Sequence, residues 1–169
     1  GALSLGCDTD KTIIVDNCTF KNNMNYTTGG IDIYVPQGNG KVYIRSSNTF
    51  ISSSTGSLIY STSNNLMFEF PQITYQDTNN NAARPLHYAQ GTNIELLDLT
   101  FENCYQTFGD GNAVLIDQPV SNCRFENCKF NNCGIKGYSV KVHGQASFAN
   151  CVFNFDSDSA ACSGLYIET

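Results

Sequence analysis

Hydrophobic and polar residues alternate along this chain in short patches that recur with a long period. One aromatic position returns about every 27 residues, which indicates an internal repeat. Its copies are Phe20, Phe50, Tyr75, Phe101, Phe130 and Phe153. The positions two, five and seven residues before it are mostly apolar, and those between them are mostly polar. Because a spacing of two places side chains on one face of a strand, each repeat predicts two short β-strands separated by a kink.

A further strand is predicted ahead of each kinked pair. Its copies are residues 31–34, 58–61, 86–89, 113–116, 139–142 and 165–168, with residues 2–5 as an earlier one. Most of them follow a glycine, which permits the positive φ of a sharp turn. Two residues after the aromatic position comes a polar column that suits a tight bend: Asn22, Ser52, Asp77, Asn103 and Asn132. Each repeat therefore contains a strand, a turn, a kinked strand pair, a bend and a variable loop.

A repeat of this size predicts one coil of a β-helix, since it is short for a propeller blade or a helical repeat. We expect one domain over residues 1–169: an all-β, single-stranded, right-handed parallel β-helix (β-solenoid) of about six coils of roughly 27 residues. Coils stacked in register would place each aromatic residue on the next and form a ladder inside the stack. Arg45 falls in an otherwise apolar column, so we expect the alignment to slip by one residue there.

The composition narrows the class of protein. Of the 169 residues, 41% are hydrophobic and 14% are charged, which is typical of a folded domain rather than a disordered chain. The net charge of −6 argues against a nucleic-acid partner, because phosphate binding needs a basic surface. No apolar run is long enough for a membrane span within this segment.

Eight cysteines fit an oxidising compartment, and so an extracellular or cell-surface location. Cys104 and Cys133 share one position in successive coils, which makes them the candidate disulfide. Apolar columns hold four others, expected to act as small buried groups: Cys18, Cys123, Cys128 and Cys151. Asn17 and Asn25 begin Asn-x-Thr triplets and are candidate glycosylation sites.

Two short motifs resemble those of a known family. Gly29-Gly30-Ile31 and Phe20-Lys-Asn-Asn23 are similar to the GGA(I/L/V) and FxxN repeats of chlamydial polymorphic membrane proteins. These belong to the wider class of pectin-lyase-like and adhesin β-helices. The resemblance implies a secreted or cell-surface solenoid with an adhesive or structural role. Its partner would be a host or cell-surface protein or a glycan.

A carbohydrate-active lyase or glycosidase is an alternative. Glu69 and Glu95 share an outward column, and stacking would place their carboxylates about 5 Å apart, as in retaining glycosidases. Arg124 comes next in that column, however, and favours a surface ladder in which it neutralises Glu95. Neither His87 nor His143 has a partner typical of a catalytic triad. We therefore expect no catalytic residue, no cofactor and no metal.

A column of threonines suggests a second alternative, the ordering of water at an ice surface. It contains Thr19, Thr49, Thr74 and Thr100 and is interrupted by Lys129. Because threonine is also favoured on any solvent-facing strand, we prefer the simpler interpretation.

Both ends of the chain resemble open strands. They contain Ala2, Leu3 and Leu5 at one end and Leu165, Tyr166 and Ile167 at the other, with no polar cap. One explanation is a segment of a longer solenoid. The other is end-to-end stacking of identical chains into an extracellular filament. The expected function is a non-enzymatic structural or adhesive solenoid, with a filament subunit as the alternative.

Overall fold

Every regular element in the described part of the chain is a β-strand. The computed structural model describes residues 2–8, 10–21, 33–36, 40–45, 49–51, 57–62, 66–69, 84–88, 93–102, 104, 111–133, 137–155 and 162–169. The longest sheet contains, in spatial order, β1 (Leu3–Ser4), β4 (Ile33–Val35), β7 (Ser57–Ser61), β9 (Arg84–Tyr88), β12 (Val114–Glu126), β14 (Gly137–Ala149) and β16 (Cys162–Glu168). This order follows the order in the chain, as expected when each coil adds one strand.

The kinked strand pairs form the other faces of the stack. The first face contains β2 (Thr12–Val15), β5 (Lys41–Arg45) and β8 (Leu66–Glu69), and β10 (Asn93–Leu97) pairs with the second half of β12. The short strands after the kink are β3 (Thr19–Lys21), β6 (Thr49–Ile51), β11 (Thr100–Glu102), β13 (Lys129–Asn131) and β15 (Val152–Asn154).

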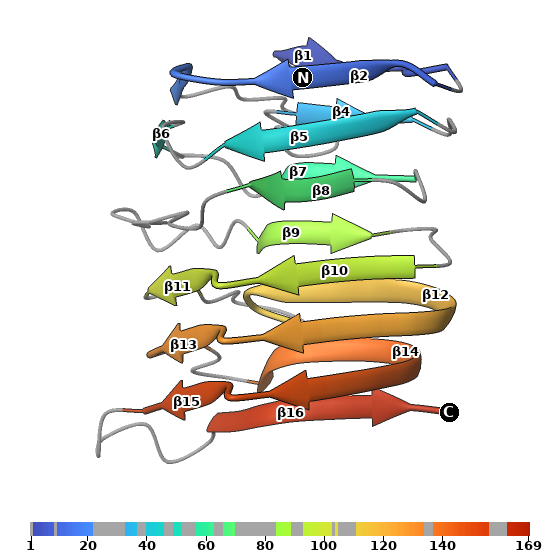
Figure 1. Ribbon diagram of the computed structural model, residues 1–169. Coiled ribbons are helices and arrows are strands. Elements are labelled where there is room, and N and C mark those ends of the chain that lie inside the picture. The colour runs from blue at the N-terminus through green and yellow to red at the C-terminus, as the bar shows by residue number, and fades with distance from the viewer. Residues whose placement is uncertain are drawn as a thin grey trace, which may run out of the picture.

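All strand pairs are parallel and connect successive coils. The chain runs to the right along the back of the stack and to the left along its front while it descends from the N-terminus to the C-terminus (Figure 1). That path is right-handed. The structure is therefore the right-handed parallel β-solenoid that the repeat predicts.

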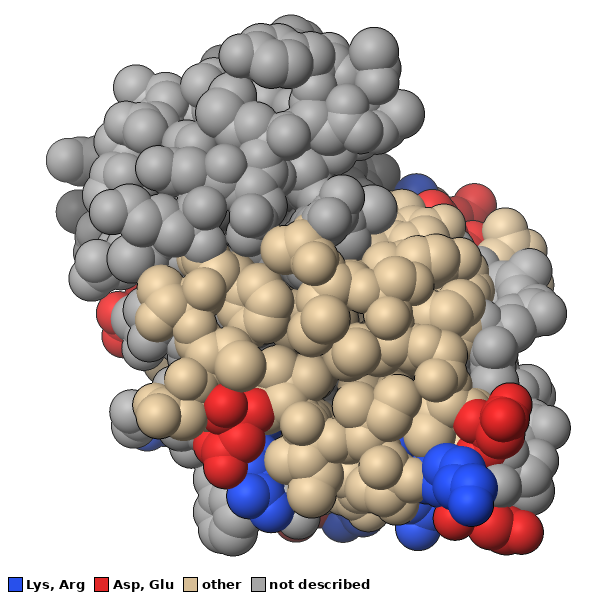
Figure 2. Space-filling model, turned by 90° about the horizontal axis from the view of Figure 1, so that it is seen from above, with Lys and Arg blue, Asp and Glu red and all other residues tan. Residues whose placement is uncertain are grey.

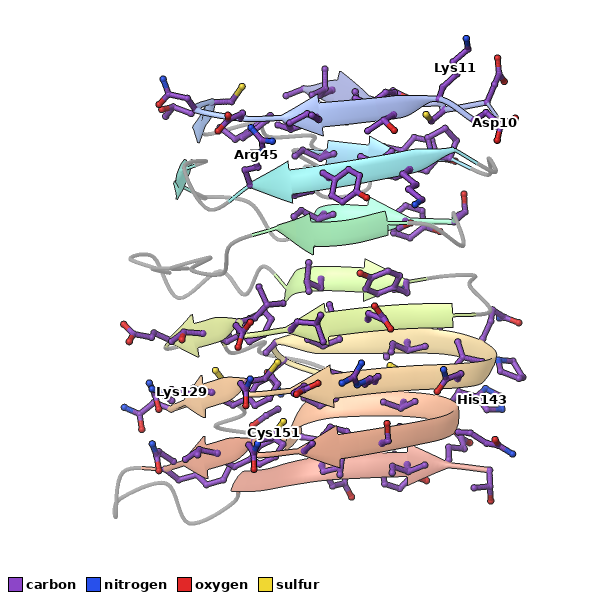
Figure 3. The ribbon with its side chains drawn as sticks, viewed as in Figure 1. Asp10, Lys11, Arg45, Lys129, His143 and Cys151 are labelled. Atoms are coloured by element: carbon purple, nitrogen blue, oxygen red, sulfur yellow. The ribbon has the colours of Figure 1, made fainter. Side chains whose placement is uncertain are left out.

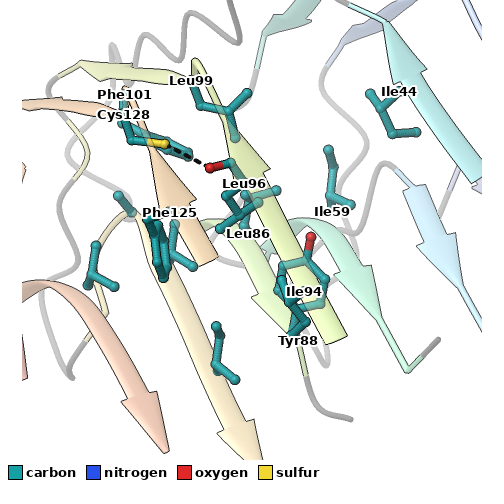
Figure 4. Close-up of a cluster of buried hydrophobic side chains, with 14 of the residues drawn as sticks. Ile44, Ile59, Leu86, Tyr88, Ile94, Leu96, Leu99, Phe101, Phe125 and Cys128 are labelled. Atoms are coloured by element: carbon teal, nitrogen blue, oxygen red, sulfur yellow. Dashed lines mark hydrogen bonds between the residues drawn. The ribbon is translucent and has the colours of Figure 1, made fainter. Parts of the chain in front are cut away.

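The aromatic ladder is confirmed where the structure describes it. Phe101, Phe130 and Phe153 pair in register, with ring centroids 5.1 and 4.7 Å apart and nearly parallel planes. Phe20 and Phe50 are also in register, whereas Tyr75 lies outside the described residues. Aliphatic side chains fill the remainder of the interior around this ladder (Figure 4). Like residues thus stack on like residues along the axis of the core.

The register slips where Arg45 suggested that it would. Val15 pairs with Ile44, and Ile44 pairs with Phe68, so Ile44 occupies the core column instead of Arg45. Phe68 lies seven residues before Tyr75, so the repeat assigned it to the column two residues before that of Val15. The loops between these strands differ in length, and counting back from the aromatic position therefore gave the wrong partner in these coils.

The kink between the paired strands is made by residues with positive φ. The same place in four coils is occupied by Asn17, Asp98, Asn127 and Asn150, with φ between 51° and 55°. Asn127 Nδ2 donates to Asp98 Oδ1 at 2.8 Å, and Asn150 Nδ2 donates to Asn127 Oδ1 at 3.3 Å. Asn and Asp adopt this conformation at low cost, and their side chains link one coil to the next.

The predicted bend after the aromatic position is seen only at Asn132, which has φ 51°. The other members of that polar column, Asn22, Ser52, Asp77 and Asn103, lie outside the described residues.

Two coils replace the predicted turn with a continuous bent strand. β12 and β14 each curve from the back of the stack to its front (Figure 1). At the corner Val120 pairs with Gly144, between two register shifts. Gly144 has φ 112°, and a Cβ atom there would lie 2.5 Å from the Val120 carbonyl oxygen. Only glycine permits this close approach of two backbones.

Candidate functional site

The outward carboxylates considered for catalysis lie beside arginines. Glu95 pairs in register with Arg124, and the Arg124 Nη1–Glu95 Oε1 distance is 3.9 Å. Arg124 Nη2 also donates to Glu126 Oε2. One guanidinium therefore contacts two carboxylates, of which Glu95 is exposed and Glu126 is half-buried, which is the arrangement of a surface ion ladder.

The two acids of the proposed catalytic pair belong to different ladders. Glu69 pairs in register with Arg45, and no strand pairing joins it to Glu95 within the described residues. Arg45 in turn contacts the Asp16 carboxylate at 3.0 Å. Each of the two acids therefore has an arginine beside it in register in a neighbouring coil.

An outward column on the longest sheet is the feature that counting from the aromatic ladder missed. Its members pair in register from one coil to the next: Tyr34, Tyr60, His87, Leu115, Lys141 and Tyr166. We call these six residues the outer column. The Tyr34 and Tyr60 ring centroids are 5.7 Å apart, and His87 meets Tyr60 edge-on at 4.9 Å. The signal was present in the repeated apolar-Tyr/His-apolar order of these strands.

Ionisable groups hold this column in place. His87 Nε2 lies 2.7 Å from Asp117 Oδ2, and the backbone oxygen of Asp117 lies 3.3 Å from His143 Nδ1. Burial, with smaller effects from Tyr34 and Asp117, raises the pKa of Tyr60. These contacts orient the imidazole of His87 against a carboxylate and an aromatic ring.

At the other end of the outer column, Lys141 Nζ lies 5.2 Å from the Tyr166 ring centroid and 3.5 Å from Glu168 Oε2. The Tyr166 ring stacks on Tyr138 at 4.8 Å. Aromatic and charged side chains therefore continue along this face to the last described strand.

The structure shows no disulfide between Cys104 and Cys133, and their pairing stays a prediction. Both side chains are buried. Cys104 donates to the Glu102 carbonyl oxygen at 3.5 Å, and Cys133 donates to those of Asn131 and Phe101 at 3.4 and 3.5 Å. The shared position in successive coils was correct, but each thiol is directed at backbone oxygens.

Two ionisable groups inside the stack are held in their neutral forms. Burial raises the pKa of Cys123 to about 12, and it raises the pKa of Tyr88 well above its usual value. The Tyr88 hydroxyl has no hydrogen-bond partner among the described residues. Thiols with pKa values this high are poor nucleophiles at neutral pH, which agrees with a packing role for Cys123.

Among the remaining predicted sites, Asn17 is exposed in the kink after β2. Its glycosylation stays a prediction, and Asn25 lies outside the described residues. Within the described ranges, no group of three or more His, Cys, Asp or Glu side chains converges as a metal site would require. The same ranges contain no helix with the length and apolar character needed to cross a membrane.

The two terminal strands carry partly exposed apolar residues. β1 pairs with β4 and β16 pairs with β14, and these strands lie at opposite ends of the stack (Figure 1). Ile167 pairs in register with the fully buried Val142, yet 39% of its own surface is exposed. Viewed from the N-terminal end, uncharged residues fill the middle of the coloured surface and charged residues lie at its periphery (Figure 2). Apolar side chains that continue the core columns are therefore only partly covered in β1 and β16.

Comparison of the chain with protein-family models, with curated proteins and with solved structures gives no match. The chain is identified by its architecture, as a parallel β-solenoid.

Proposed function

We propose that this chain is a non-enzymatic structural or adhesive solenoid of the cell surface or extracellular space, as the resemblance to chlamydial polymorphic membrane proteins implies. The observation that carries the proposal is that outward polar side chains connect neighbouring coils. Arg45 joins Asp16, Arg124 joins Glu95, and Asn127 joins Asp98. Side chains committed to such ladders stiffen a rod and offer few free groups for acid–base chemistry.

The outer column supports an adhesive role. Tyr34 and Tyr60 are half-buried, so part of each ring meets solvent. They lie side by side in the outer column of the longest sheet. Tyrosine is enriched in protein recognition because it adds a large amphipathic surface at low entropic cost. The proposed partner is a host or cell-surface protein or a glycan.

A binding experiment with a cleavage control tests this proposal. The chain is incubated with cells and with a panel of pectins, alginates and surface glycans, and both retention and new reducing ends are measured. We expect retention without cleavage. The double variant Tyr34→Ser/Tyr60→Ser should lose at least tenfold in retention with an unchanged melting temperature. Ile14→Ser, at a half-exposed site on another face, should bind normally. Cleavage that disappears in Glu95→Gln would instead establish an enzyme.

A filament subunit is a second candidate function, favoured by the partial exposure of Ile167 on β16. An added coil on β16 would bury Ile167, as β14 buries the residue at the same place in β12. A second copy could provide that coil through β1 and propagate the stack.

Concentration-dependent light scattering with negative-stain imaging distinguishes a filament from a single rod. Growth of filaments that Ile167→Lys abolishes would support end-to-end stacking, with Ile14→Lys as the control on a lateral face. A monodisperse monomer at high concentration would contradict it.

A further inference from the structure

Cys128 and Cys151 occupy the same place in adjacent coils. Each directly follows a residue of positive φ and directly precedes a short strand, β13 or β15. Lys129 pairs in register with Val152, and the Val152 amide donates to the Cys128 carbonyl oxygen at 2.9 Å. Adjacent parallel strands lie about 4.8 Å apart, and disulfides span Cα separations of about 4.4–6.8 Å. The backbone therefore already has the separation that a disulfide needs.

The side chains of Cys128 and Cys151 also influence each other. Burial, and to a smaller extent the neighbouring Cys151 thiol, raises the pKa of the Cys128 thiol. Cys128 donates to the Leu96 carbonyl oxygen at 3.2 Å (Figure 4).

Access differs between the two thiols. Cys128 is fully buried, whereas Cys151 is half-buried on the β15 side of the stack (Figure 3). A small oxidant can reach Cys151 first, and Cys128 is then placed to resolve the adduct. Cys104 and Cys133 lack this arrangement because both are fully buried.

We propose that Cys128 and Cys151 are a redox-active pair that closes into an inter-coil disulfide by exchange with a small-molecule disulfide such as oxidised glutathione.

The exchange has two displacement steps. The Cys151 thiolate attacks one sulfur of the small disulfide, which breaks its S–S bond, forms a mixed disulfide and releases one small thiolate. The Cys128 thiolate then attacks the Cys151 sulfur, forms the protein S–S bond and releases the second small thiolate. Two protein thiols are oxidised, one small disulfide is reduced to two thiols, and the two protons pass to the released thiolates.

Burial limits the second step. It raises the pKa of Cys128 to about 11, so only a small fraction is thiolate at neutral pH. Closure should therefore be slow at pH 7 and accelerate about tenfold for each unit of pH up to about 10.

The test treats the folded chain with oxidised glutathione, followed by acid quenching, proteolysis without reductant and mass spectrometry. We expect a peptide pair joined through Cys128 and Cys151 and the loss of two thiols by titration. Cys128→Ala should stop at a glutathione adduct on Cys151, and Cys151→Ser should give neither adduct nor closure at Cys128. Cys18→Ser, at a half-buried thiol in a different coil, should close like the wild type.

Circular dichroism before and after oxidation shows whether the chain stayed folded. Because the wild type itself gives the decisive result, a variant that misfolds leaves the test intact. A bond between Cys104 and Cys133, closure only in denaturant, or retention of all thiols after prolonged treatment at pH 9 would overturn the proposal.

Discussion

Phe101 is a fully enclosed member of the aromatic ladder. It is fully buried and its ring stacks on Phe130. Phe101→Ala should destabilise the fold by about 3–5 kcal/mol, because it removes a large apolar side chain and leaves a cavity between rigid coils. Urea denaturation measures this change. Phe153→Ala, at the half-buried end of the same ladder, should cost less. A loss below about 1 kcal/mol at Phe101 would contradict the packing.

Cys123 makes the stability depend on pH. Its folded-state pKa is about 12, above the value of 9.0 for a free thiol, so the folded state holds the proton more tightly than the unfolded state. Its contribution to stability is therefore complete below pH 9 and is lost as the pH rises towards 12.

Comparison with Cys123→Ala isolates this contribution from other groups that titrate at high pH. Between pH 8 and 10.5 the wild type should lose about 2 kcal/mol more unfolding free energy than the variant. Urea denaturation at the two pH values measures the difference. Equal losses in both proteins would show that the thiol does not control this dependence.

At the scale of the element, the corner of β12 and β14 depends on one glycine. The Cβ atom of Gly144→Ala would lie 2.5 and 2.6 Å from the Val120 carbonyl oxygen and nitrogen, at a backbone φ of 112°. Backbone atoms inside a ladder cannot move aside cheaply, so we expect a loss of about 3 kcal/mol or more. Gly6→Ala is the matched control, since its Cβ atom would meet only Pro36 Cγ at 3.7 Å. Thermal unfolding of both variants measures the contrast, and equal melting temperatures would contradict the bent-strand corner.

At the scale of the whole molecule, each coil contacts chiefly the coils before and after it. In such an array, stability is a sum of local and nearest-neighbour contributions, and opening can start at the ends. The interior of the stack around β12 and β14 contains the stacked phenylalanines and continuous bent strands. This region should be the last to open.

Native-state hydrogen exchange tests that expectation. Amides of residues 114–116 and 140–142 should exchange slowest, and those of β1 should exchange orders of magnitude faster. Peptide-resolved mass spectrometry reports both regions in one experiment. Uniform protection along the chain would indicate a single cooperative unit instead.

The sequence by itself determined the repeat, the parallel solenoid and the aromatic ladder. Each of these follows from spacing, because equal positions of successive coils must stack when every coil adds one strand. Phe101, Phe130 and Phe153 could therefore be aligned before any coordinate was known. The order of apolar and polar residues also placed the kink, although not the asparagines that make it.

Only the tertiary structure decided the features that spacing does not encode. Loops of unequal length moved Ile44 rather than Arg45 into the core, and the close approach at Gly144 fused two predicted strands into one. Shared offsets placed Cys104 and Cys133 at one position just as they did Cys128 and Cys151. The depth of each side chain in the stack depends on packing across coils. It buried both thiols of the first pair and left Cys151 of the second pair half-buried.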